Sequence, residues 1–421
     1  MATLETASPL MYLLFDCNNF FASCEQVFRP DWRNRPLVVL SNNDGCVVSR
    51  SREAKAAGIA MGEPYFKCRE RLERIGGVVC SGNFALYNDL SERVMRILEE
   101  ALPETQQYSI DEAFGVVDDT RDWVPFCRSL RRRIAHWTGI TVSVGIAPTR
   151  TLAKLANERA KKEERHAGVL ALVTPGETLP YLEQSPLEDV WGIGRRLAPR
   201  LRGMGFRTAA DVARADLERL RRAFGVHGER LALELRGLPC VDEEDGETER
   251  TQVMVSRTMK EGIRDIATLR DALSRFTEKA GRILRREGLM ASSLYVILRT
   301  SRYEQAEHLA CDSAGVPLPC PTDDSRVFLR AASALLEGLF REGYDYRKLG
   351  VMLADLQAAS SVQPTFEHPE VATSPLMTVL DKLQAAGHPI HFASSSAAPL
   401  WHSDHSSPEY TTRWDQLPEA H

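Results

Sequence analysis

The sequence contains no long uninterrupted apolar run. No window approaches the ~20 consecutive apolar residues that a membrane-spanning helix needs. The N-terminus also lacks the basic region and the apolar region that together mark a secretion signal. Both absences argue against an integral membrane protein and against a secreted one. Instead, 43% hydrophobic and 26% charged residues are typical of a globular protein, and a chain of 421 residues allows about two to four domains.

Paired cysteine spacings are absent as well. The nine cysteines are scattered, and no two of them have the C-x-x-C spacing of zinc sites and redox motifs. We therefore expect reduced thiols in a cytoplasmic protein.

The net charge of −5 does not by itself indicate a nucleic-acid-binding protein, but the charge is unevenly distributed. Residues 191–238 contain 11 arginines against five acidic residues, whereas residues 242–249 (DEEDGETE) are strongly acidic. A basic module followed by a solvated acidic connector predicts a domain boundary, and we place the linker at 241–250.

Hydrophobic periodicity predicts alternating strands and helices over residues 11–173, with a small unit inserted at roughly 30–75. The clearest elements there are the helix 149–162 and the β-like runs 11–16, 106–117, 139–147 and 168–173. Residues 175–238 have helical patterns only.

The remainder of the chain divides into a third folded region and a tail. Residues 251–357 contain two long helical patterns and β-like runs at 252–257, 293–300 and 348–356. Beyond residue 358 the composition is rich in Ser, Ala, Pro and His, which predicts a poorly ordered tail with one helix at 375–385.

Acidic residues stand at two places where a catalytic site is plausible. Asp16 ends the predicted strand 11–16, and Asp111 and Glu112 lie in the apolar stretch YSIDEAF. A surface turn would also explain an isolated Asp-Glu pair. If the two strands are neighbours in one sheet, however, three carboxylates converge. Hard oxygen ligands in that number suit Mg²⁺, and two such ions suit phosphoryl transfer.

A helix start is predicted directly after Asp16. Asn18 or Asn19 can cap this helix, which would direct the free backbone N–H groups of Phe20 and Phe21 toward the same place. Helix N-termini of this kind bind phosphate groups.

Two basic faces could complement these acids. Lys154 and Lys161 are seven residues apart on the predicted helix 149–162, and Arg52 and Lys55 are three residues apart on another short helix. The simpler interpretation is solvated surface charge. Acids together with two basic faces in one alternating domain favour a triphosphate site, which needs both Mg²⁺ and cations.

A glycine- and arginine-rich stretch forms the third candidate site. Residues 190–213 (VWGIGRRLAPRLRGMGFRTAADVA) predict two short helices joined by glycine turns. Their backbone N–H groups and arginines could contact nucleic-acid phosphates without reading bases. An ordinary helical hairpin is the alternative. The proposed DNA-binding residues are Gly192, Gly194, Arg195, Arg196 and Arg200.

Together these stretches resemble the Y-family (translesion) DNA polymerases, and within that family the UmuC branch. The resemblance runs from about Met11 to Trp414. It is carried by DCNNFFASCEQVFRP, LSNNDGCVVSRSREAKAAGIAMGEPYFK, YSIDEAF, VSVGIAPTRTLAKLANERAKK, DVWGIGRRL and LRGLPC, and in the tail by LMTVLDKL and SPEYTTRW.

The resemblance implies an α+β multidomain fold of the right-hand polymerase type. The implied parts are a leader (1–10), a palm (11–30 and 76–165), fingers (31–75), a helix-hairpin-helix thumb (166–240), the linker (241–250), a little finger (251–357) and a partner-binding tail (358–421).

The resemblance also assigns roles to single residues. Asp16, Asp111 and Glu112 match the catalytic, metal-binding acids, and the main-chain carbonyl of Cys17 matches a further metal ligand. Phe21 falls at the steric-gate position, which rejects ribonucleotides. The implied nucleotide-binding residues are Asn18, Asn19, Phe20, Phe21, Ser49, Arg52, Lys55 and Lys161.

Some positions depart from the family pattern. The gate is often Tyr, so the phenyl ring of Phe21 lacks the usual hydroxyl, and Arg52 stands where other branches have Tyr. The QPTF stretch at 363–366 is a poor match to a clamp-binding motif, which makes sliding-clamp binding through it doubtful. The leader 1–10 precedes the usual start, so Met11 is an alternative initiator.

The resulting hypothesis is error-prone, template-directed DNA synthesis past damaged bases with two Mg²⁺ ions. The implied substrates are primer-template DNA and deoxynucleoside triphosphates, and the implied partners are a UmuD-like dimer and a RecA filament at the nucleoid. A polymerase-like scaffold would have lost an acid at 16, 111 or 112, and all three are present. A nucleotide cyclase would not need the arginine-rich helices.

Overall fold

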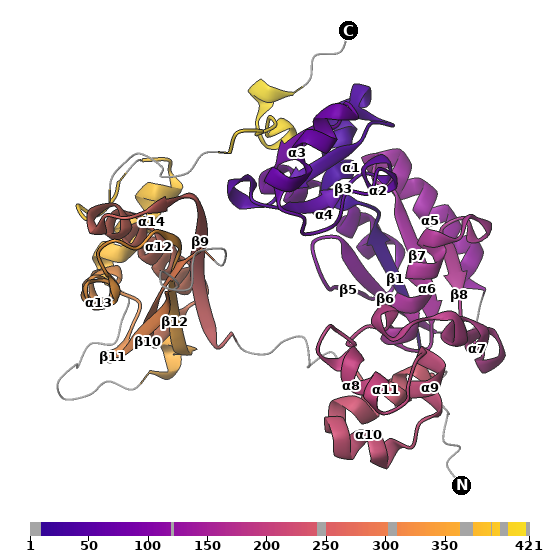
Figure 1. Cartoon of the computed structure of the whole chain (residues 1–421). Helices are drawn as coiled ribbons and strands as arrows, with labels where there is room; N and C mark the ends of the chain where they lie inside the picture. The colour runs from indigo at the N-terminus through magenta and orange to yellow at the C-terminus, as the bar shows by residue number, and fades with distance from the viewer. Residues whose placement is uncertain are drawn as a thin grey trace. The chain divides into compact units, whose positions relative to one another are not determined.

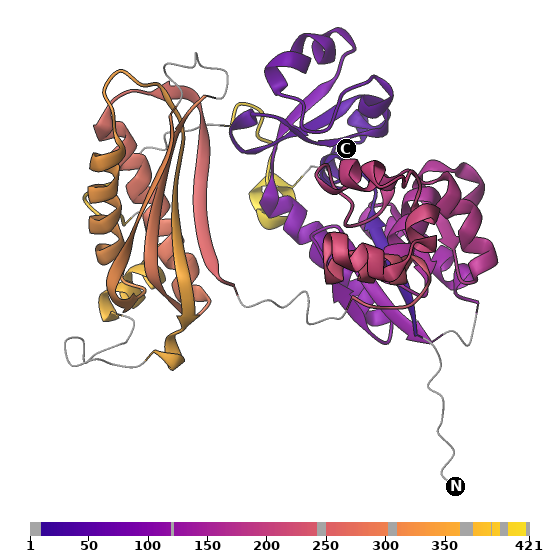
Figure 2. The ribbon, with the colours of Figure 1, turned by 60° about the horizontal axis from the view of Figure 1, so that its bottom comes forward.

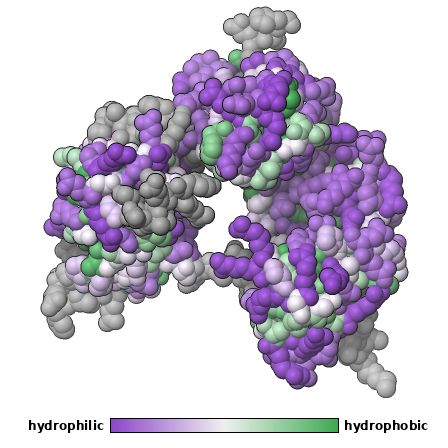
Figure 3. All heavy atoms as spheres, in the orientation of Figure 1, coloured by the Kyte–Doolittle hydropathy of each residue, from purple (hydrophilic) through white to green (hydrophobic). Residues whose placement is uncertain are grey.

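The computed structural model describes residues 10–118, 122–241, 250–301, 310–362, 374–388, 390–395 and 403–417. The chain forms two compact units, one from residues 1–247 and 404–421 and the other from residues 248–403 (Figure 1). Hydrophilic side chains cover most of the visible face of each unit (Figure 3). None of the described helices combines the length and the apolar composition that a membrane crossing requires. None of the nine cysteines, all of which lie in the described part of the chain, forms a disulfide.

The first unit is built around a five-stranded sheet in the order β5-β6-β1-β7-β8. Its strands are β1 (Leu10–Cys17), β5 (Thr105–Gln107), β6 (Glu112–Asp118), β7 (Val142–Ala147) and β8 (Val169–Ala171). The apolar β1 lies in the centre, antiparallel to both β6 and β7, and β8 runs parallel to β7. The sheet is therefore mixed, with its most apolar strand buried on both faces.

The prediction of one β run over 106–117 is wrong in detail. This stretch is a hairpin, in which β5 ends at Gln107 and β6 begins at Glu112. The N–H groups of Tyr108 and Ser109 both donate to the Glu112 carbonyl oxygen, at 3.0 and 3.1 Å, which closes the turn. Asp111 therefore lies in a turn, and Glu112 opens a strand.

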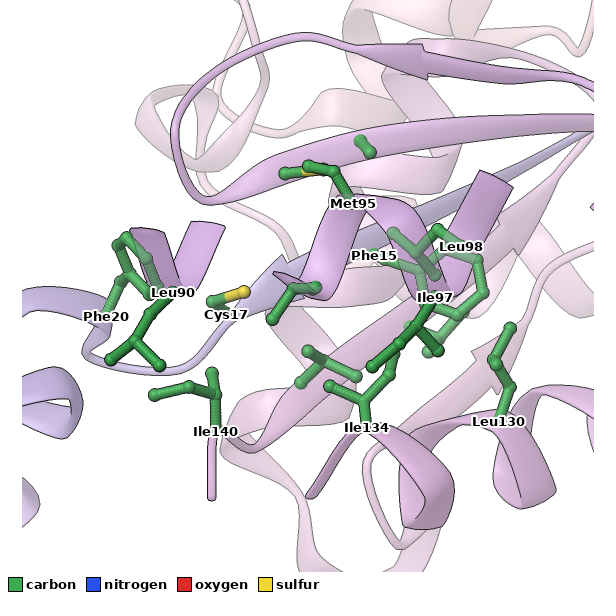
Figure 4. Close-up of a cluster of buried hydrophobic side chains, with 14 of the residues drawn as sticks. Phe15, Cys17, Phe20, Leu90, Met95, Ile97, Leu98, Leu130, Ile134 and Ile140 are labelled. Carbon is green, nitrogen blue, oxygen red and sulfur yellow. The ribbon is translucent and has the colours of Figure 1, made fainter. Parts of the chain in front are cut away.

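Alternation along β1 separates the two faces of the sheet. Leu13, Phe15 and Cys17 pack against α1 (Phe20–Phe28), α4 (Phe84–Ala101) and α5 (Trp123–Thr138), in the core drawn in Figure 4. Leu14 packs on the opposite face with α6 (Arg150–Lys162). Because side chains alternate along a strand, Asp16 falls on the α6 face.

Helix α6 approaches the sheet unusually closely at Gly145 of β7. A Cβ atom there would overlap the Ala153 carbonyl oxygen and lie 2.5 Å from the Asn157 backbone nitrogen. The buried Asn157 side chain donates to the carbonyl oxygens of Leu14 (3.2 Å) and Ser143 (2.8 Å), so it ties α6 to both central strands. Gly145 and Asn157 together fix the height of α6 above the sheet.

A small three-stranded sheet in the order β3-β2-β4 is inserted after α1. It consists of β2 (Leu37–Leu40), β3 (Val47–Arg50) and β4 (Val78–Ser81), with α2 (Arg52–Ala56) and α3 (Tyr65–Arg74) between the last two. Strands β2 and β3 pair antiparallel. The inserted unit extends beyond residue 75, because β4 pairs with β2.

The helical region predicted at 175–238 contains α7 (Pro175–Gln184), α8 (Leu197–Gly203), α9 (Ala209–Arg214), α10 (Leu217–Phe224) and α11 (Val226–Leu235). Helix α8 begins at Leu197, so Arg195 and Arg196 precede it rather than lying on it. In the turn before α8, Gly192 has a φ of 90°, which favours glycine.

The second unit is a four-stranded antiparallel sheet in the order β11-β10-β12-β9, with its two long helices on one face (Figure 2). Its elements are β9 (Gln252–Ile263), α12 (Ile266–Arg286), β10 (Leu289–Thr300), β11 (Cys311–Thr322), α13 (Ser325–Leu339) and β12 (Tyr346–Ala358). The sequence did not predict β11. Its prolines at 317, 319 and 321 argue against a strand, but β11 is an edge strand, where missing N–H donors are tolerated.

The prediction of a poorly ordered tail is wrong for its described parts. Helix α14 (Pro375–Ala385) has the predicted bounds, and Asp381 on it pairs with Arg285 of α12 at 2.6 Å. Residues 404–417 belong to the first unit, where Tyr410 is buried. The leader 1–9, the acidic stretch 242–249 and the QPTF stretch 363–366 lie outside the described residues.

Replacing Gly145 by Ala should force α6 away from β7. The added methyl group has no space against the α6 backbone, so we expect a loss of about 1–3 kcal/mol in the free energy of unfolding, measured by urea denaturation. Gly176→Ala in α7 is the matched control, because a Cβ there meets nothing within 4 Å. Equal stability of the two variants would contradict the close approach.

Candidate active site

Two of the three predicted carboxylates lie on neighbouring strand ends, and the third lies in the turn before β6. Asp16 on β1 is in register with Glu112, the first residue of β6. The Cys17 N–H donates to the Asp111 carbonyl oxygen at 2.8 Å, which extends the contact into the turn before β6. The two strands are therefore neighbours, as the predicted convergence of the carboxylates requires.

The buried Cys17 thiol, on the opposite face of the sheet, is close enough to the three acids to be affected by their charges. Burial raises the pKa of this thiol well above its usual value, and the charges of Asp16, Asp111 and Glu112 raise it further. The positive charge of Lys161 partly opposes them. The strand ends thus form a local concentration of negative charge.

Two lysines of α6 reach this negative region. Lys161 Nζ lies 2.7 Å from Asp16 Oδ2, and Lys154 Nζ lies 3.1 Å from Glu112 Oε2. All four side chains are at least three-quarters buried, so solvated surface charge is not the right description of either lysine. The seven-residue spacing places one ammonium group over each strand.

Lys154 is further held by two aromatic rings that sequence reasoning missed. Its Nζ lies 4.3 Å from the ring centre of Tyr108 and 4.9 Å from that of Trp191. The two rings meet edge to face, with their centres 5.7 Å apart. These cation–π contacts link the β5–β6 turn and the glycine turn before α8 to the site.

The position of Asp16 shifts the pKa of its carboxyl group. Burial raises its pKa to about 7, the nearby Lys161 opposes this shift, and Glu112 adds to it. The raised pKa is therefore first of all a consequence of burial, and the neighbouring Glu112 carboxylate makes a smaller contribution. Two carboxylates side by side fit a hard divalent cation, for which carboxylate oxygens are the preferred ligands.

The carboxylates do not form a finished metal cage. Among the described residues, no three His, Cys, Asp or Glu side chains are grouped closely enough to hold a metal ion. Asp111 Oδ1 instead accepts a hydrogen bond from Ser109 Oγ at 2.7 Å. The site therefore presents the right donor types, with Asp16 and Glu112 each bound to a lysine and Asp111 to a hydroxyl.

The two asparagines after Asp16 do not cap α1 through their side chains, contrary to the prediction. Asn19 occupies the N-cap position in a left-handed conformation (φ 51°), and its side chain accepts a hydrogen bond from Lys55. The Asn18 side chain accepts from Ser143 Oγ at 2.9 Å and so anchors the turn to β7. Asparagine tolerates the left-handed region, which allows the chain to turn sharply from strand to helix.

The start of α1 is tied to the small sheet by Ser49. Its buried hydroxyl accepts from the Ala22 N–H at 3.2 Å and donates to the Asn19 carbonyl oxygen at 3.4 Å. Phe20, by contrast, is buried in the core (Figure 4), so only its backbone could face a ligand. The signal for Ser143 was available in the alternation of the run 141–146, where position 143 is polar.

The predicted cations of α2 separate in the structure. Lys55 points toward the site: burial lowers its pKa, and the positive charges of Arg50 and Lys161 lower it further. Arg52 is exposed and lies 3.6 Å from Glu164. Lys55 and Lys161 thus lie close to Asp16, whereas Arg52 pairs with the exposed Glu164.

The Phe21 ring lies at the edge of the core with one face covered. It stacks on Tyr87 of α4, with ring centres 4.5 Å apart and planes inclined by 12°, and it meets the edge of Phe84 at 5.7 Å. It is only partly buried. The ring therefore has a defined orientation without any polar anchor of its own.

The predicted DNA-binding residues lie around the glycine turn before α8. Gly192, Gly194, Arg195 and Arg196 are exposed. Arg200 donates to the Ala223 carbonyl oxygen at 2.9 Å and covers the Phe224 ring. A hollow of about 360 Å³ lies beside the turn, lined by Gly192, Arg200, Phe224, His227, Arg230 and Leu231 among others.

Comparison with known protein families matches most of the chain. Residues 15–158 match the impB/mucB/samB family, and residues 250–366 match the impB/mucB/samB family C-terminal domain. Residues 374–420 match a domain of unknown function (DUF4113).

Individual relatives match over nearly the full length. The chain is 41% identical over 418 residues to Protein UmuC of Salmonella typhimurium, spanning 97% of this chain and 99% of the relative. It is 32% identical over 364 residues to DNA polymerase IV of Streptomyces coelicolor, covering 84% and 72% of the two chains. A solved Y-family DNA polymerase chimera, Dbh-Dpo4(243-245)-Dbh, shares the fold with a TM-score of 0.66 at 23% identity, covering 83% of this chain and 99% of the chimera.

Removing the Lys161 ammonium should leave the Asp16 carboxylate buried without its partner. We expect Lys161→Met to lower the free energy of unfolding at neutral pH by about 1–3 kcal/mol in urea denaturation, because an unpaired, partly buried charge is costly. The double variant Asp16→Asn with Lys161→Met should recover most of the loss.

Lys162→Met is the matched control, since this neighbouring lysine is half exposed and only loosely paired with Asp189 at 3.5 Å. It should change stability by less than about 0.5 kcal/mol. If Lys161→Met were as stable as the control, the ion pair with Asp16 would have no structural importance.

Proposed function

The chain belongs to the impB/mucB/samB family, and from this membership we propose that it copies damaged DNA templates by metal-dependent nucleotidyl transfer at Asp16, Asp111 and Glu112. It is a DNA-directed DNA polymerase with the fold of the Y family. The observation that carries the assignment of the site is the register of Asp16 with Glu112, each paired with a lysine of α6.

We assign the parts of the fold to the subdomains that the family resemblance implies. The five-stranded sheet with α1, α4, α5 and α6 is the palm, and the small sheet with α2 and α3 is the fingers. The helices α7 to α11 are the thumb, and the second unit is the little finger. The fingers are small, which suits a site that must accept distorted base pairs.

Two Mg²⁺ ions would be held by Asp16, Asp111, Glu112 and the main-chain carbonyl of Cys17. When bound, such ions activate the primer 3′-hydroxyl and stabilise the leaving pyrophosphate. The register of Asp16 with Glu112, and the hydrogen bond that holds the Asp111 turn against Cys17, support this assignment.

The protein itself positions the nucleotide. Lys161 and Lys55 place two ammonium groups beside Asp16, where they would hold the triphosphate, and Arg52 would reach it from the margin. The first N–H groups of α1, at Phe20 and Phe21, have no partner within the helix and would donate to phosphate oxygens. Phe21 would meet the sugar and exclude a 2′-hydroxyl group.

The thumb would hold the DNA through its backbone. The exposed Arg195 and Arg196 beside the glycine turn would contact phosphates, and the backbone N–H groups of Gly192 and Gly194 would add uncharged contacts. Binding of this kind is independent of base sequence.

The cellular role is drawn from the family. We place the enzyme in the SOS response, at the nucleoid, with a UmuD-like dimer and a RecA filament as partners. Primer extension across an abasic site, with and without these two partners, separates a multi-subunit enzyme from one that works alone. Sliding-clamp binding through 363–366 stays doubtful on the sequence alone.

Substitution of the turn and strand-end acids should abolish synthesis. We expect Asp111→Asn and Glu112→Gln to lower primer extension at least about 10²-fold, on undamaged and abasic templates alike, because several kcal/mol of transition-state stabilisation depend on the metal ligands. Extension is measured with a labelled primer and single-nucleotide additions.

The exposed carboxylate of Asp31, which pairs with Arg29, supplies the control Asp31→Asn, and this variant should extend normally. Failure of the wild-type protein to extend any primer, or undiminished extension by Asp111→Asn, would contradict the proposed function.

The thumb contacts predict a specific salt dependence of DNA binding. Arg195→Ala and Arg196→Ala should each weaken binding equally for unrelated sequences and reduce the slope of log K against log salt by about 1. Binding is measured by fluorescence anisotropy over a range of NaCl concentrations. The control is Arg202→Ala, whose guanidinium already pairs with Glu188. An unchanged slope in both test variants would place the DNA elsewhere.

A further inference from the structure

The C-terminal segment, residues 404–412, returns to the first unit after the chain has completed the second (Figure 1). The Asp404 N–H donates to Asp44 Oδ2, and the Ser81 N–H donates to the His405 carbonyl oxygen, both at 2.8 Å. The Tyr410 ring stacks on Phe28 of α1, with the ring centres 4.7 Å apart. The segment therefore contacts the small sheet and the first helix of the palm.

Ser407, in the middle of this segment, reaches the interior between α1 and α4. Its Oγ donates to Glu25 Oε1 at 3.0 Å and accepts from Asn83 Nδ2 at 2.9 Å. Asn83 is the N-cap of α4, where its side chain accepts from the Leu86 N–H, and its Nδ2 also donates to the Pro408 carbonyl oxygen at 2.8 Å. One serine thus connects the start of α4 to the middle of α1.

Glu25 receives a second hydrogen bond, from a residue that also contacts the gate ring. Tyr87 Oη donates to Glu25 Oε1 at 2.7 Å, and the Tyr87 ring stacks on Phe21. Phe21 and Glu25 are four residues apart on α1, so they lie on the same face of the helix. Tyr87 therefore holds α1 at two points one turn apart, by its ring and by its hydroxyl.

Burying the Glu25 carboxylate in this position costs free energy. It is completely buried, and burial raises its pKa to about 7. Its second oxygen, Oε2, has no hydrogen-bond partner within the described part of the chain. Within the described residues, its carboxylate accepts hydrogen bonds from the hydroxyls of Tyr87 and Ser407 alone. Loss of either would leave a buried carboxylate with half of its hydrogen bonds.

A phenyl gate depends on packing for its position. A tyrosine at this site could be fixed by a hydrogen bond from its hydroxyl, whereas Phe21 can only be fixed by the rings around it. Phe84 is partly exposed, whereas Tyr87 is buried. The Phe21 ring is therefore held mainly by its stacking on Tyr87. Any movement of Tyr87 would let Phe21 retreat from a 2′-hydroxyl group.

We propose that the C-terminal segment, through Ser407, locks the Glu25–Tyr87 pair and thereby fixes the Phe21 ring, which makes Ser407, Glu25 and Tyr87 positioning residues for ribonucleotide exclusion. This inference rests on the proposed polymerase function, because only that function gives Phe21 a sugar to read. It assigns to the C-terminal segment a role in substrate selection by the palm.

The test compares incorporation of dATP and ATP opposite template T, as the ratio of the two kcat/KM values. Tyr87→Leu removes both the ring behind Phe21 and the hydroxyl, and we expect the ratio to fall about tenfold, the scale on which small packing changes alter selectivity. Ser407→Ala and Tyr87→Phe each remove one hydrogen bond to Glu25 and should lower the ratio about two- to fivefold. The value of kcat/KM for dATP itself should change little.

Two further variants distinguish positioning from a loss of stability. Ser407→Thr keeps the hydroxyl and should retain the wild-type ratio. Thr411→Ala is the matched control in the same segment: its hydroxyl bonds to Asp89 of α4 at 2.6 Å, away from Glu25, and Tyr410 and His405 still anchor the segment. Thr411→Ala should keep the ratio unchanged even if its Tm falls.

The possible results distinguish the positioning role of Ser407 and Tyr87 from the polymerase function itself. A lowered ratio in Tyr87→Leu and Ser407→Ala, with normal ratios in Ser407→Thr and Thr411→Ala, supports the positioning role. Active variants that fold and keep the wild-type ratio overturn it while leaving the polymerase function intact. A wild-type protein that incorporates neither nucleotide overturns both, since no sugar is then selected.

Discussion

The ion pairs between α6 and the strand ends of the central sheet are the interaction on which the active site depends. The Asp16 and Glu112 carboxylates on adjacent strand ends repel each other, and two lysines from one helix hold them in place. This arrangement requires α6 to lie close to the sheet. Gly145 allows that approach, and the Asn157 side chain maintains it through two backbone carbonyls. The chemistry at the strand ends therefore follows from a packing constraint at the centre of the sheet.

The two faces of the same sheet carry different functions: the catalytic acids lie on one face, and the core that supports the residue selecting the sugar lies on the other. On the α6 face, Asp16 and Glu112 meet the lysines; on the opposite face, Phe15 and Cys17 pack against α1 and α4. Helix α1 begins at the sharp turn after Asp16 and carries Phe21 on its first turn. A nucleotide bound beside Asp16 would thus have its phosphates near one set of elements and its sugar near another. The C-terminal segment bears only on the second set, which is why selectivity could change without loss of synthesis.

Much of this could be predicted from the sequence because the relevant signals are local. The apolar run of β1 ending in Asp16, the alternation in β7 and the seven-residue lysine spacing each specify one element and one face. Other features depend on distant parts of the chain. Asn19 looked like a helix cap, but its partner is Lys55 on another helix. The prolines of β11 argue against a strand, and only the position of β11 at the sheet edge makes them compatible with one. Ser407 meets Glu25 across 382 residues, and no periodicity could reveal that contact.

The central claim is that the gathered carboxylates bind divalent cations for nucleotidyl transfer. The most direct measurement is electron paramagnetic resonance of Mn²⁺ bound to the protein in complex with primer-template DNA and a non-hydrolysable deoxynucleotide. Two bound ions per protein, close enough for their spins to couple, are expected in the wild-type complex, and the coupled pair should be lost in a variant that lacks the Asp16 carboxylate. Retention of the coupled pair in that variant, or absence of bound Mn²⁺ in the wild-type complex, would contradict it.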